Sequence, residues 1–384
     1  MSEPTASHVH NESCTHIHSV GDRTQVMGID HGGASEVEVE GDPSPAHRVV
    51  LPSNVLPLDS NMQELVWVGT QGQKITIIDG ISHLKFLKVL CLRSNLLRSM
   101  VGVGSVKVSL EELELYDNLL RELEDLDGAN KLRLLDVSYN RIATLEGLAG
   151  RCPALEVLYC ASNRLKDPLP GVFSACALTL TRLDLGSNSL PSMEGLECLV
   201  NLEELWLGKN KITEIKGLQA LSKLRILDVQ SNRLTRIGGL GGGASGEGIQ
   251  HPHLQELYLG HQGITVLEGL DALPALKVFD CTGNAGVTEI RGLEGCPGLT
   301  DLWAGYTGVA SFDSVLSGVA NCTSLQVLYL EHSPLAKDWE YRIRLCRGIP
   351  SLEQLDATSV SRWSSSVKSS SSVESIGGGG GQVV

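Results

Sequence analysis

Hydrophobic residues recur along this chain in a fixed pattern, with an apolar residue at the first, fourth and sixth positions of a short segment (LxxLxL). These segments begin weakly at Leu65 and then follow at Leu87, Leu110, Leu132, Leu155, Leu180, Leu202, Leu224, Leu254, Leu276, Leu299 and Leu325. Most of them start 22 or 23 residues apart. Alternation of apolar and polar positions predicts short strands with one buried face. The regular spacing predicts a solenoid whose units contact only their neighbours.

The residues between segments predict a turn and a return path. In LEELWLGKNKITEIKGLQALSK, Asn210 follows the strand, Ile212 and Ile215 continue the core, and Gly217 and Leu218 lead into a short convex helix or 3₁₀ turn. An asparagine amide can bond neighbouring backbone groups in such a bend. It recurs at Asn95, Asn118, Asn140, Asn163, Asn188, Asn210, Asn232 and Asn284, whereas Gln262, Thr307 and Ser333 replace it. These replacements predict less regular turns toward the C-terminus.

The whole pattern resembles leucine-rich repeats and predicts an α/β solenoid. Parallel strands stack about 4.8 Å apart, while the convex segments are thicker. The array should therefore curve into a horseshoe with a concave parallel sheet. We expect the repeat domain to span residues 63–358, including a C-terminal cap over about 335–358. An amphipathic stretch from Trp339 to Cys346 would form part of that cap.

Three segments depart from the pattern and lack the apolar residues of the repeats. Residues 1–62 and 359–384 are rich in polar residues and glycine, which predicts disorder. A glycine-rich insertion at 238–248 lacks a following GK[ST] and predicts a flexible surface loop rather than a nucleotide site. Histidines near the N-terminus, with Cys14, could bind trace metal, but no core would hold them in a structural zinc site.

Composition narrows the class of partner. The net charge of −14 argues against general binding to nucleic acid or to acidic membranes, which need a basic surface. We expect no membrane span and no secretory signal, because no long apolar stretch is present. The ten cysteines are scattered through the chain, and several stand at core positions. This distribution favours reduced, structural thiols and an intracellular protein.

One strand position carries the most information about function. Read at the fifth residue of each LxxLxL segment, the chain gives Cys91, Glu114, Asp136, Tyr159, Asp184, Trp206, Asp228, Tyr258, Asp280, Trp303 and Tyr329. Acid and aromatic alternate strictly from Asp136 to Trp303, although aromatics are only 4% of the chain. Interfaces are enriched in Trp and Tyr, and acids would pair with basic groups of a partner. We therefore predict an exposed protein-binding file about 40 Å long.

Catalytic chemistry is not indicated by the sequence. Acids recurring on neighbouring strands could stand at glycosidase-like distances from one another. However, an open, shallow sheet lacks the enclosure that excludes water and tunes a catalytic pair. We find no nucleophile elbow, HExxH or Walker motif. The sequence therefore predicts a protein that is not an enzyme and needs no cofactor or metal.

Several repeats resemble a particular group of leucine-rich proteins. LEELELYDN, LTRLDLGSN, LEELWLGKNKIT and LRILDVQSNRLTRI, with the C-terminal LYLEHSPLAKDWEYRIRLCRGIPSLEQLDAT, are similar to the leucine-rich regulatory subunit of type-1 protein phosphatase. The resemblance covers roughly residues 65–358. The generic 22-residue repeat is shared with ciliary and spliceosomal leucine-rich proteins. The paired LGKNKIT and QSNRLT segments and the cap are more specific.

This resemblance implies a non-catalytic subunit that holds the phosphatase catalytic subunit in its concave face, in nucleus and cytoplasm. It leaves open a further inhibitor subunit. Matching partner-binding positions are Asp136, Tyr159, Asp184, Trp206, Asp280, Asp301, Trp303 and Tyr329. Asp228 and Tyr258 fit the file geometrically, with less support from the family. The alternatives are a scaffold of cilia or the cytoskeleton and a spliceosomal protein-binding component.

Overall fold

The computed structural model describes residues 58–70, 73–241 and 251–360. The chain divides into two compact units, Met1–Asp42 and Pro43–Val384, and every described residue belongs to the second. The predictions for the histidine-containing segment, for nearly all of the 359–384 tail and for most of the glycine insertion lie outside the described residues. Leu58 and Met62 are described, and both pack against the core. The folded unit therefore extends before the predicted boundary at residue 63.

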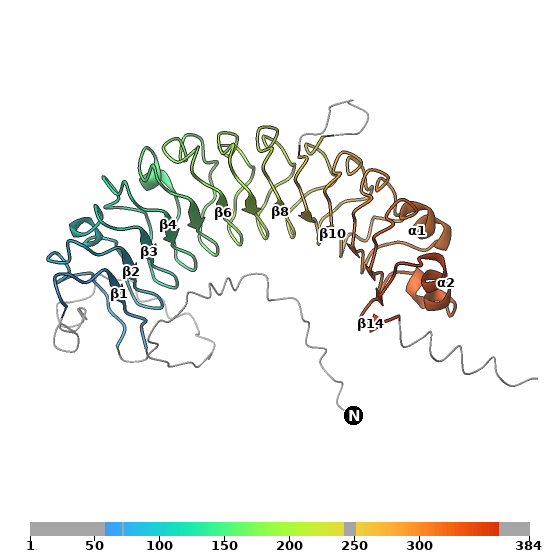
Figure 1. The fold of residues 1–384 in the computed structure, drawn as a ribbon, viewed down its shortest axis with the longest axis horizontal. Coiled ribbons are helices and arrows are strands. Elements are labelled where there is room, and N and C mark those ends of the chain that lie inside the picture. Colours follow the sequence, from blue (N-terminus) through green and yellow to red (C-terminus); the bar gives the residue numbers. More distant parts are fainter. Residues whose placement is uncertain (1–57, 71–72, 242–250, 361–384) are drawn as a thin grey trace, which may run out of the picture. The chain divides into compact units, whose positions relative to one another are not determined.

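Across the described residues, fourteen strands form one continuous sheet in chain order. They are β1 Glu64–Val66, β2 Val89–Cys91, β3 Glu112–Glu114, β4 Leu134–Asp136, β5 Val157–Tyr159, β6 Arg182–Asp184, β7 Glu204–Trp206, β8 Ile226–Asp228, β9 Glu256–Tyr258, β10 Val278–Asp280, β11 Asp301–Trp303, β12 Val327–Tyr329, β13 Gln354–Leu355 and β14 Thr358–Ser359. Neighbours from β1 to β13 pair in parallel, and β14 returns antiparallel. The strands line the inner side of an arc (Figure 1). The predicted leucine-rich repeat solenoid is confirmed.

The core lies between this sheet and the outer turns, and it is built mainly from leucine. Each strand from β1 to β12 buries its central residue. Leu205 in β7, for example, has no exposed surface. Cys160 and Cys281 take leucine positions and are fully buried, as expected. The described cysteines are free thiols. Burial raises the pKa of the Cys152 thiol to about 12, which fits a packing role rather than a reactive one.

The asparagines form a hydrogen-bonded ladder that joins consecutive repeats. Asn210 Oδ1 accepts from the Leu190 backbone N–H at 2.9 Å. Its Nδ2 donates to the carbonyl oxygens of Leu185 and Leu207, both at 3.0 Å. One buried amide thereby satisfies backbone groups of two successive turns, which would otherwise be unpaired away from water. This arrangement explains why the turn requires asparagine.

Toward the C-terminus other residues take over parts of the ladder. Gln262 Oε1 accepts from the Leu234 N–H at 3.0 Å, and its amide donates to the Val229 carbonyl. Thr307 Oγ1 donates to the Ala304 carbonyl at 2.7 Å, and Asp356 Oδ1 accepts from the Leu330 N–H at 3.0 Å. The bonding varies as predicted, yet β9 to β12 keep the same three-residue register as the strands before them.

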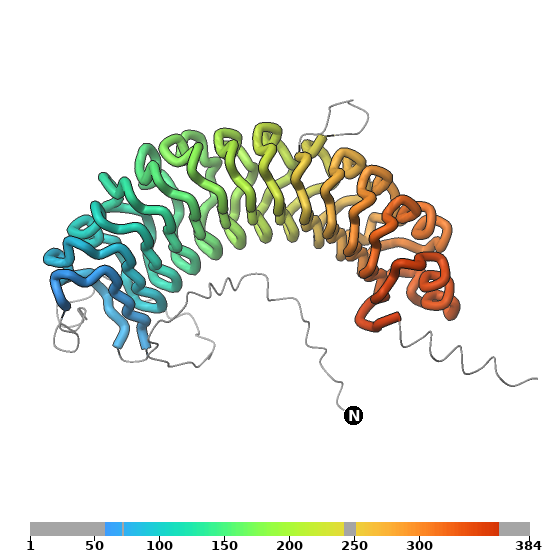
Figure 2. Tube along the Cα trace, in the orientation of Figure 1, coloured from blue at the N-terminus to red at the C-terminus, as the bar shows by residue number. Residues whose placement is uncertain are grey.

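The convex side is mostly turns, with few short helices in the described residues. These are η2 Val103–Ser105, η3 Glu146–Leu148 and α1 Phe312–Gly318. These turns follow the outside of the arc, as the tube in Figure 2 shows. At Gly239, with φ of 71°, a Cβ atom would stand 2.2 Å from the Ile215 carbonyl oxygen of the preceding repeat. Glycine is therefore required at this contact.

A cap closes the C-terminal end, as predicted, and most of the amphipathic stretch lies in a helix that begins at Tyr341. It consists of η5 Leu335–Lys337, α2 Tyr341–Gly348 and the antiparallel pair β13 and β14. Tyr341 and Leu345 of α2 are buried, and the Tyr341 hydroxyl donates to Asp356. Trp339 precedes the helix and is 83% exposed, so its place in the amphipathic stretch was wrong. The cap also continues past residue 358, since Ser359 pairs in β14.

Candidate protein-binding face

The predicted acid and aromatic residues form a single aligned file on the concave sheet. Strand pairing places each of them directly beside the next, as in Asp136 with Tyr159, Asp184 with Trp206, and Trp303 with Tyr329. We call the acid–aromatic file the set Asp136, Tyr159, Asp184, Trp206, Asp228, Tyr258, Asp280, Trp303 and Tyr329. Asp228 and Tyr258 stand in the same register as the rest. The strand register therefore aligns these residues, and their role in binding a partner stays a prediction.

The carboxylates of this file are less exposed than the pattern predicts. Asp228 and Asp280 are only 9% and 8% exposed. Each acid of the file bends back, and its Oδ1 accepts from the backbone N–H two residues further on: Ser138 at 3.0 Å, and Gly186, Gln230 and Thr282 at 2.8 Å each. Such a bond stabilises the turn after the strand. Aspartate at this position thus has a structural role that the sequence pattern did not reveal.

Glycines beside the file leave room for these bent carboxylates. A Cβ atom at Gly208 would lie 2.9 Å from Asp228 Oδ2 on the next strand, and one at Gly260 would lie 3.1 Å from Asp280 Oδ2. Larger residues would push the carboxylates out of their turns. Glycine at these two positions therefore permits the bent orientation of the neighbouring carboxylates.

The aromatic residues gather toward the C-terminal half of the file. The ring centroids of Tyr258 and Trp303 are 6.2 Å apart, although Asp280 stands on the strand between them. Strands two steps apart are separated by about 9.6 Å, so these two rings lean together over Asp280. Tyr329 meets Trp303 edge-on at 6.4 Å. The three rings make a half-buried aromatic cluster of the kind that anchors protein interfaces.

A second concave position adds further acids. It comprises Val89, Glu112, Leu134, Val157, Arg182, Glu204, Ile226, Glu256, Val278, Asp301 and Val327, which are paired in register and half-buried. Asp301, predicted as a site residue, belongs to this flanking file. Arg182 is its one cation and stands 3.5 Å from Glu204. The two files together present mixed apolar and acidic chemistry, which suits a basic partner surface.

Burial shifts the titration of the central acids. It raises the pKa of Asp184 and Asp228 to about 6, and the negative charges of acids two strands away add to the effect. The backbone N–H groups of Gly186 and Gln230 act in the opposite direction. Burial likewise raises the pKa of Asp136. These acids lack full compensation in the isolated chain, so a partner cation would favour their charged form.

Sequence reasoning missed or undervalued several aromatic contacts. Tyr258 had less support from the family, yet it is part of the aromatic cluster. At the N-terminal rim, Arg93 lies 4.6 Å from the ring centroid of Tyr116, which contacts Tyr139 at 4.9 Å. These residues lie two or three positions beyond the strand. Reading those positions down the same repeat alignment would have revealed them.

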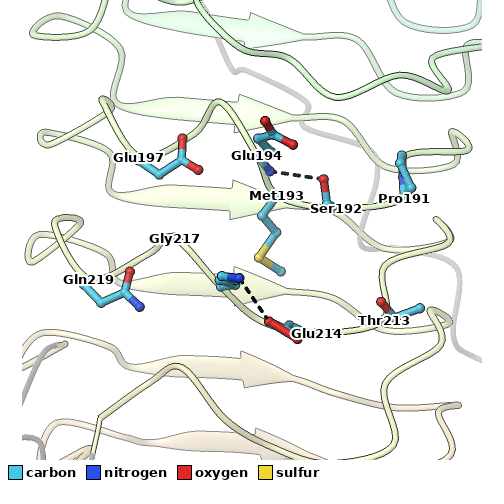
Figure 3. Close-up of a pocket in the computed structure, with 10 residues that line it drawn as sticks. Pro191, Ser192, Met193, Glu194, Glu197, Thr213, Glu214, Gly217 and Gln219 are labelled. Atoms are coloured by element: carbon cyan, nitrogen blue, oxygen red, sulfur yellow. Dashed lines mark hydrogen bonds and ion pairs between the residues drawn. The ribbon is translucent and has the colours of Figure 1, made fainter.

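The hollows on the described part of the chain do not assemble a recognisable catalytic site. One of about 430 Å³ lies between two repeats and is lined by Ser192, Glu194, Glu214 and Lys216, among others (Figure 3). Ser192 Oγ accepts from the Glu194 backbone N–H at 3.4 Å, and Lys216 pairs with Glu214 at 3.7 Å. Neither contact activates a nucleophile. In the same described residues, no group of three potential metal ligands occurs, and no helix is long and apolar enough to span a membrane.

The repeat geometry and the parallel concave sheet define a leucine-rich repeat protein. The family model "Leucine Rich repeats (2 copies)" matches residues 130–171, 178–220 and 200–242. Among solved structures, an internalin from Listeria monocytogenes gives a TM-score of 0.59 at 20% identity, covering 77% of this chain and 87% of that one. The PEPR1–AtPEP1 complex gives 0.57 at 21% identity, covering 77% and 45%. These likenesses establish the fold, which typically serves as a non-catalytic binding module.

Two relatives share part of the repeat array. The chain is 33% identical over 153 residues to the protein phosphatase 1 regulatory inhibitor subunit PPP1R7 homolog of Arabidopsis thaliana. It is 32% identical over 147 residues to leucine-rich repeats and immunoglobulin-like domains protein 3 of Homo sapiens. The matches cover 39% and 37% of this chain. They span 43% of the first relative and 12% of the second.

Proposed function

We propose that this chain is a non-catalytic regulatory subunit that binds the catalytic subunit of protein phosphatase 1 through its concave face. The acid–aromatic file is the observation that carries the proposal. The partial similarity to a phosphatase regulatory inhibitor subunit supports this choice of partner. A chain that binds in this way would act by covering part of the enzyme, and so by changing its maturation, location or choice of substrate.

The file offers two kinds of contact to such a partner. Trp206, Trp303 and Tyr329 provide large rings with few rotamers to lose, which is the composition of interface hot spots. Asp184 and Asp228 flank Trp206 and carry charge that the isolated chain compensates incompletely. Arginine or lysine from the partner could lie over these carboxylates and against the rings. The partner surface should therefore be basic and broad, to match a file about 40 Å long.

The proposal places the chain in the nucleus and cytoplasm. Free thiols support an intracellular location, because Cys160, Cys176 and Cys281 are buried and unpaired in the structure. Fluorescence microscopy of a tagged full-length chain would test the location directly. Confinement to the cell exterior would contradict it.

Affinity capture from cell extract tests the choice of partner. The full chain is compared with a Trp206→Ala/Trp303→Ala double variant and with Leu178→Ala, which removes an exposed leucine outside both files. We expect the wild type and Leu178→Ala to recover the phosphatase catalytic subunit, and the double variant to lose it. A further inhibitor subunit would appear in the same eluate. Recovery of ciliary, cytoskeletal or spliceosomal proteins without the phosphatase would contradict the proposal.

A further inference from the structure

The cap carries an unusually exposed aromatic residue. Trp339 lies between η5 and α2 and is 83% exposed, the most of any large apolar side chain in the described residues. A tryptophan can bury roughly 150–250 Å² when it is covered. Single exposed apolar residues need no explanation, so the surroundings of Trp339 decide whether it has a role.

The turn that carries Trp339 is held firmly. The Asp338 N–H donates to the Leu335 carbonyl at 3.1 Å, and the Tyr341 N–H donates to the Asp338 carbonyl at 3.1 Å. The Glu340 N–H also donates to Asp338 Oδ1 at 2.8 Å. These bonds fix the backbone on both sides of the indole. A ring presented on a fixed backbone loses little freedom when a partner covers it.

Trp339 forms one wall of an acidic hollow of about 370 Å³. The other lining residues are Glu331, His332, Ala336, Asp338, Tyr341, Arg342 and Asp356. Arg342, the one Arg or Lys side chain in this set, is already bound: its guanidinium donates to the carbonyl oxygens of Leu355 and Thr358 and lies 3.7 Å from Asp356. Glu331 and Asp338 therefore leave the hollow acidic.

A stacked pair of rings extends this surface. His332 lines the hollow and stacks on Tyr306, with ring centroids 4.2 Å apart and an interplanar angle of 16°. Both residues have positive φ, 60° and 55°, and both are exposed. Positive φ recurs at this turn position in other repeats, as at Ser187 and Lys209, so it belongs to the repeat and does not by itself mark this site. Aromatic faces and uncompensated acids thus occur together at this edge.

We propose that this hollow binds an arginine side chain from a basic segment of a partner protein. The guanidinium would stack on the Trp339 indole while Glu331 and Asp338 supply the opposite charge. Arginine fits better than lysine, because its planar group stacks on rings and presents several donors to carboxylates. The acidic lining opposes phosphate groups and anionic lipid surfaces. This site uses no residue of the acid–aromatic file, although Tyr329 lies beside it through Gln354, and it does not depend on the phosphatase assignment.

Peptide binding to the full chain tests the site. The probes are short glycine–serine peptides that carry two arginines, two lysines or two citrullines, the last having the shape of arginine without its charge. Fluorescence anisotropy should show that the arginine peptide binds best and that the citrulline peptide does not bind. Trp339→Ala should weaken binding about tenfold or more. Asp338→Asn, which keeps the acceptor for the Glu340 N–H, should weaken it less.

Matched variants separate this site from the concave face. Leu178→Ala removes another highly exposed apolar residue, 71% exposed, and should leave binding unchanged. Trp206→Ala is titrated in parallel, because the acid–aromatic file also offers rings and acids to basic side chains; loss of binding with Trp339→Ala but not with Trp206→Ala assigns the bound peptide to the cap. The proposal is overturned if the wild type does not bind the arginine peptide, if citrulline binds equally well, or if binding follows Trp206 rather than Trp339. Equal melting temperatures for wild type and Trp339→Ala would show that the fold is preserved.

Discussion

Asp184 and Asp228 stand on either side of Trp206 and show how a binding face can oppose stability. Their carboxylates are mostly buried, and their charged forms are favoured mainly by hydrogen bonds from Gly186 and from Gln230, with the more distant charge of Lys209 also acting on Asp228. Burying charge without a cation costs free energy. Proteins retain residues that destabilise the folded chain where those residues are needed for function, here for binding a partner. In the proposed complex, basic side chains of the partner would compensate them.

Replacing these two acids by asparagine should stabilise the free chain. A pKa raised from 3.8 to about 6 means that the folded state holds protons that the unfolded state releases between these pH values. The free energy of unfolding therefore falls as pH rises from about 4 to 6, and the loss persists at neutral pH. Asp184→Asn and Asp228→Asn keep the turn acceptor and remove the charge. Each should add about 1–3 kcal/mol at pH 7.5 and less at pH 5.

Urea unfolding at the two pH values measures this effect. Asp127→Asn is the matched control, because Arg151 lowers the pKa of that exposed carboxyl and the sign of its contribution is opposite. It should not stabilise the chain at pH 7.5. Lower stability of both buried variants at pH 7.5 would show that these acids stabilise the free chain.

At this scale the repeat alignment identified which residues share the file but not how they point. Register depends on the hydrophobic pattern, which a 22- or 23-residue period repeats many times. Asp280 accepts a hydrogen bond from the Thr282 N–H, and the rings of Tyr258 and Trp303, from the strands on either side of it, approach each other. Such contacts combine local geometry with neighbours that a single repeat does not contain. The exposed acids predicted from the pattern are therefore partly turn residues.

The repeating element of this protein is a three-residue strand followed by an asparagine turn. The strand buries its central residue against the neighbouring repeats. The asparagine hydrogen-bonds the backbone of one turn to that of the next. Short strands pair weakly by themselves, so most of their stability comes from packing and from these links. The element is defined by its neighbours as much as by its own residues.

Asn210→Ala tests the importance of this link. The substitution leaves the Leu190 N–H and the carbonyls of Leu185 and Leu207 without their side-chain partner. We expect a loss of about 2–4 kcal/mol in the free energy of unfolding, because buried groups lose hydrogen bonds. Hydrogen exchange should rise in the repeats on either side. Asn201→Ala, whose amide bonds a single carbonyl at an exposed position, should have little effect.

Sequence predicted the elements well wherever the ladder was intact. It also identified Gln262 as a break, but not that its longer side chain still forms the two bonds to the preceding repeat. The bonding partners of Gln262 are 28 and 33 residues away, across the glycine insertion. Contacts over such separations follow from the completed fold. The sequence pattern could therefore locate the irregular turn at Gln262 but could not predict the hydrogen bonds formed there.

The repeats together form a linear array, so the two ends of the array matter most at the scale of the whole molecule. Each repeat contacts its neighbours, and α2 with β13 and β14 covers the last of them. Terminal units of such arrays shield the core that would otherwise face water. The cap was predicted from this requirement. The exposed Trp339 was not, since an apolar residue in a capping segment is expected to be buried.

Leu345→Ala should loosen the C-terminal repeats before the rest of the array. Leu345 is fully buried in α2, and removing such a side chain costs about 2–5 kcal/mol. Hydrogen exchange should increase in β11 to β13 and stay unchanged in β2 to β5, because each repeat is stabilised only by its contacts with the adjacent repeats. Arg347→Ala, on an exposed part of the same helix, serves as control. A uniform increase along the array would contradict this linear behaviour.

Titration of the full chain with purified protein phosphatase 1 catalytic subunit tests the central claim most directly. Calorimetry should show saturable binding, and Trp303→Ala should weaken it by about 1–4 kcal/mol, the cost of losing an interface hot spot. Leu178→Ala and Trp339→Ala should bind like the wild type. Absence of binding by the wild type would refute the choice of partner. Unchanged binding by folded Trp303→Ala and Trp206→Ala variants would show that the acid–aromatic file is not the binding surface.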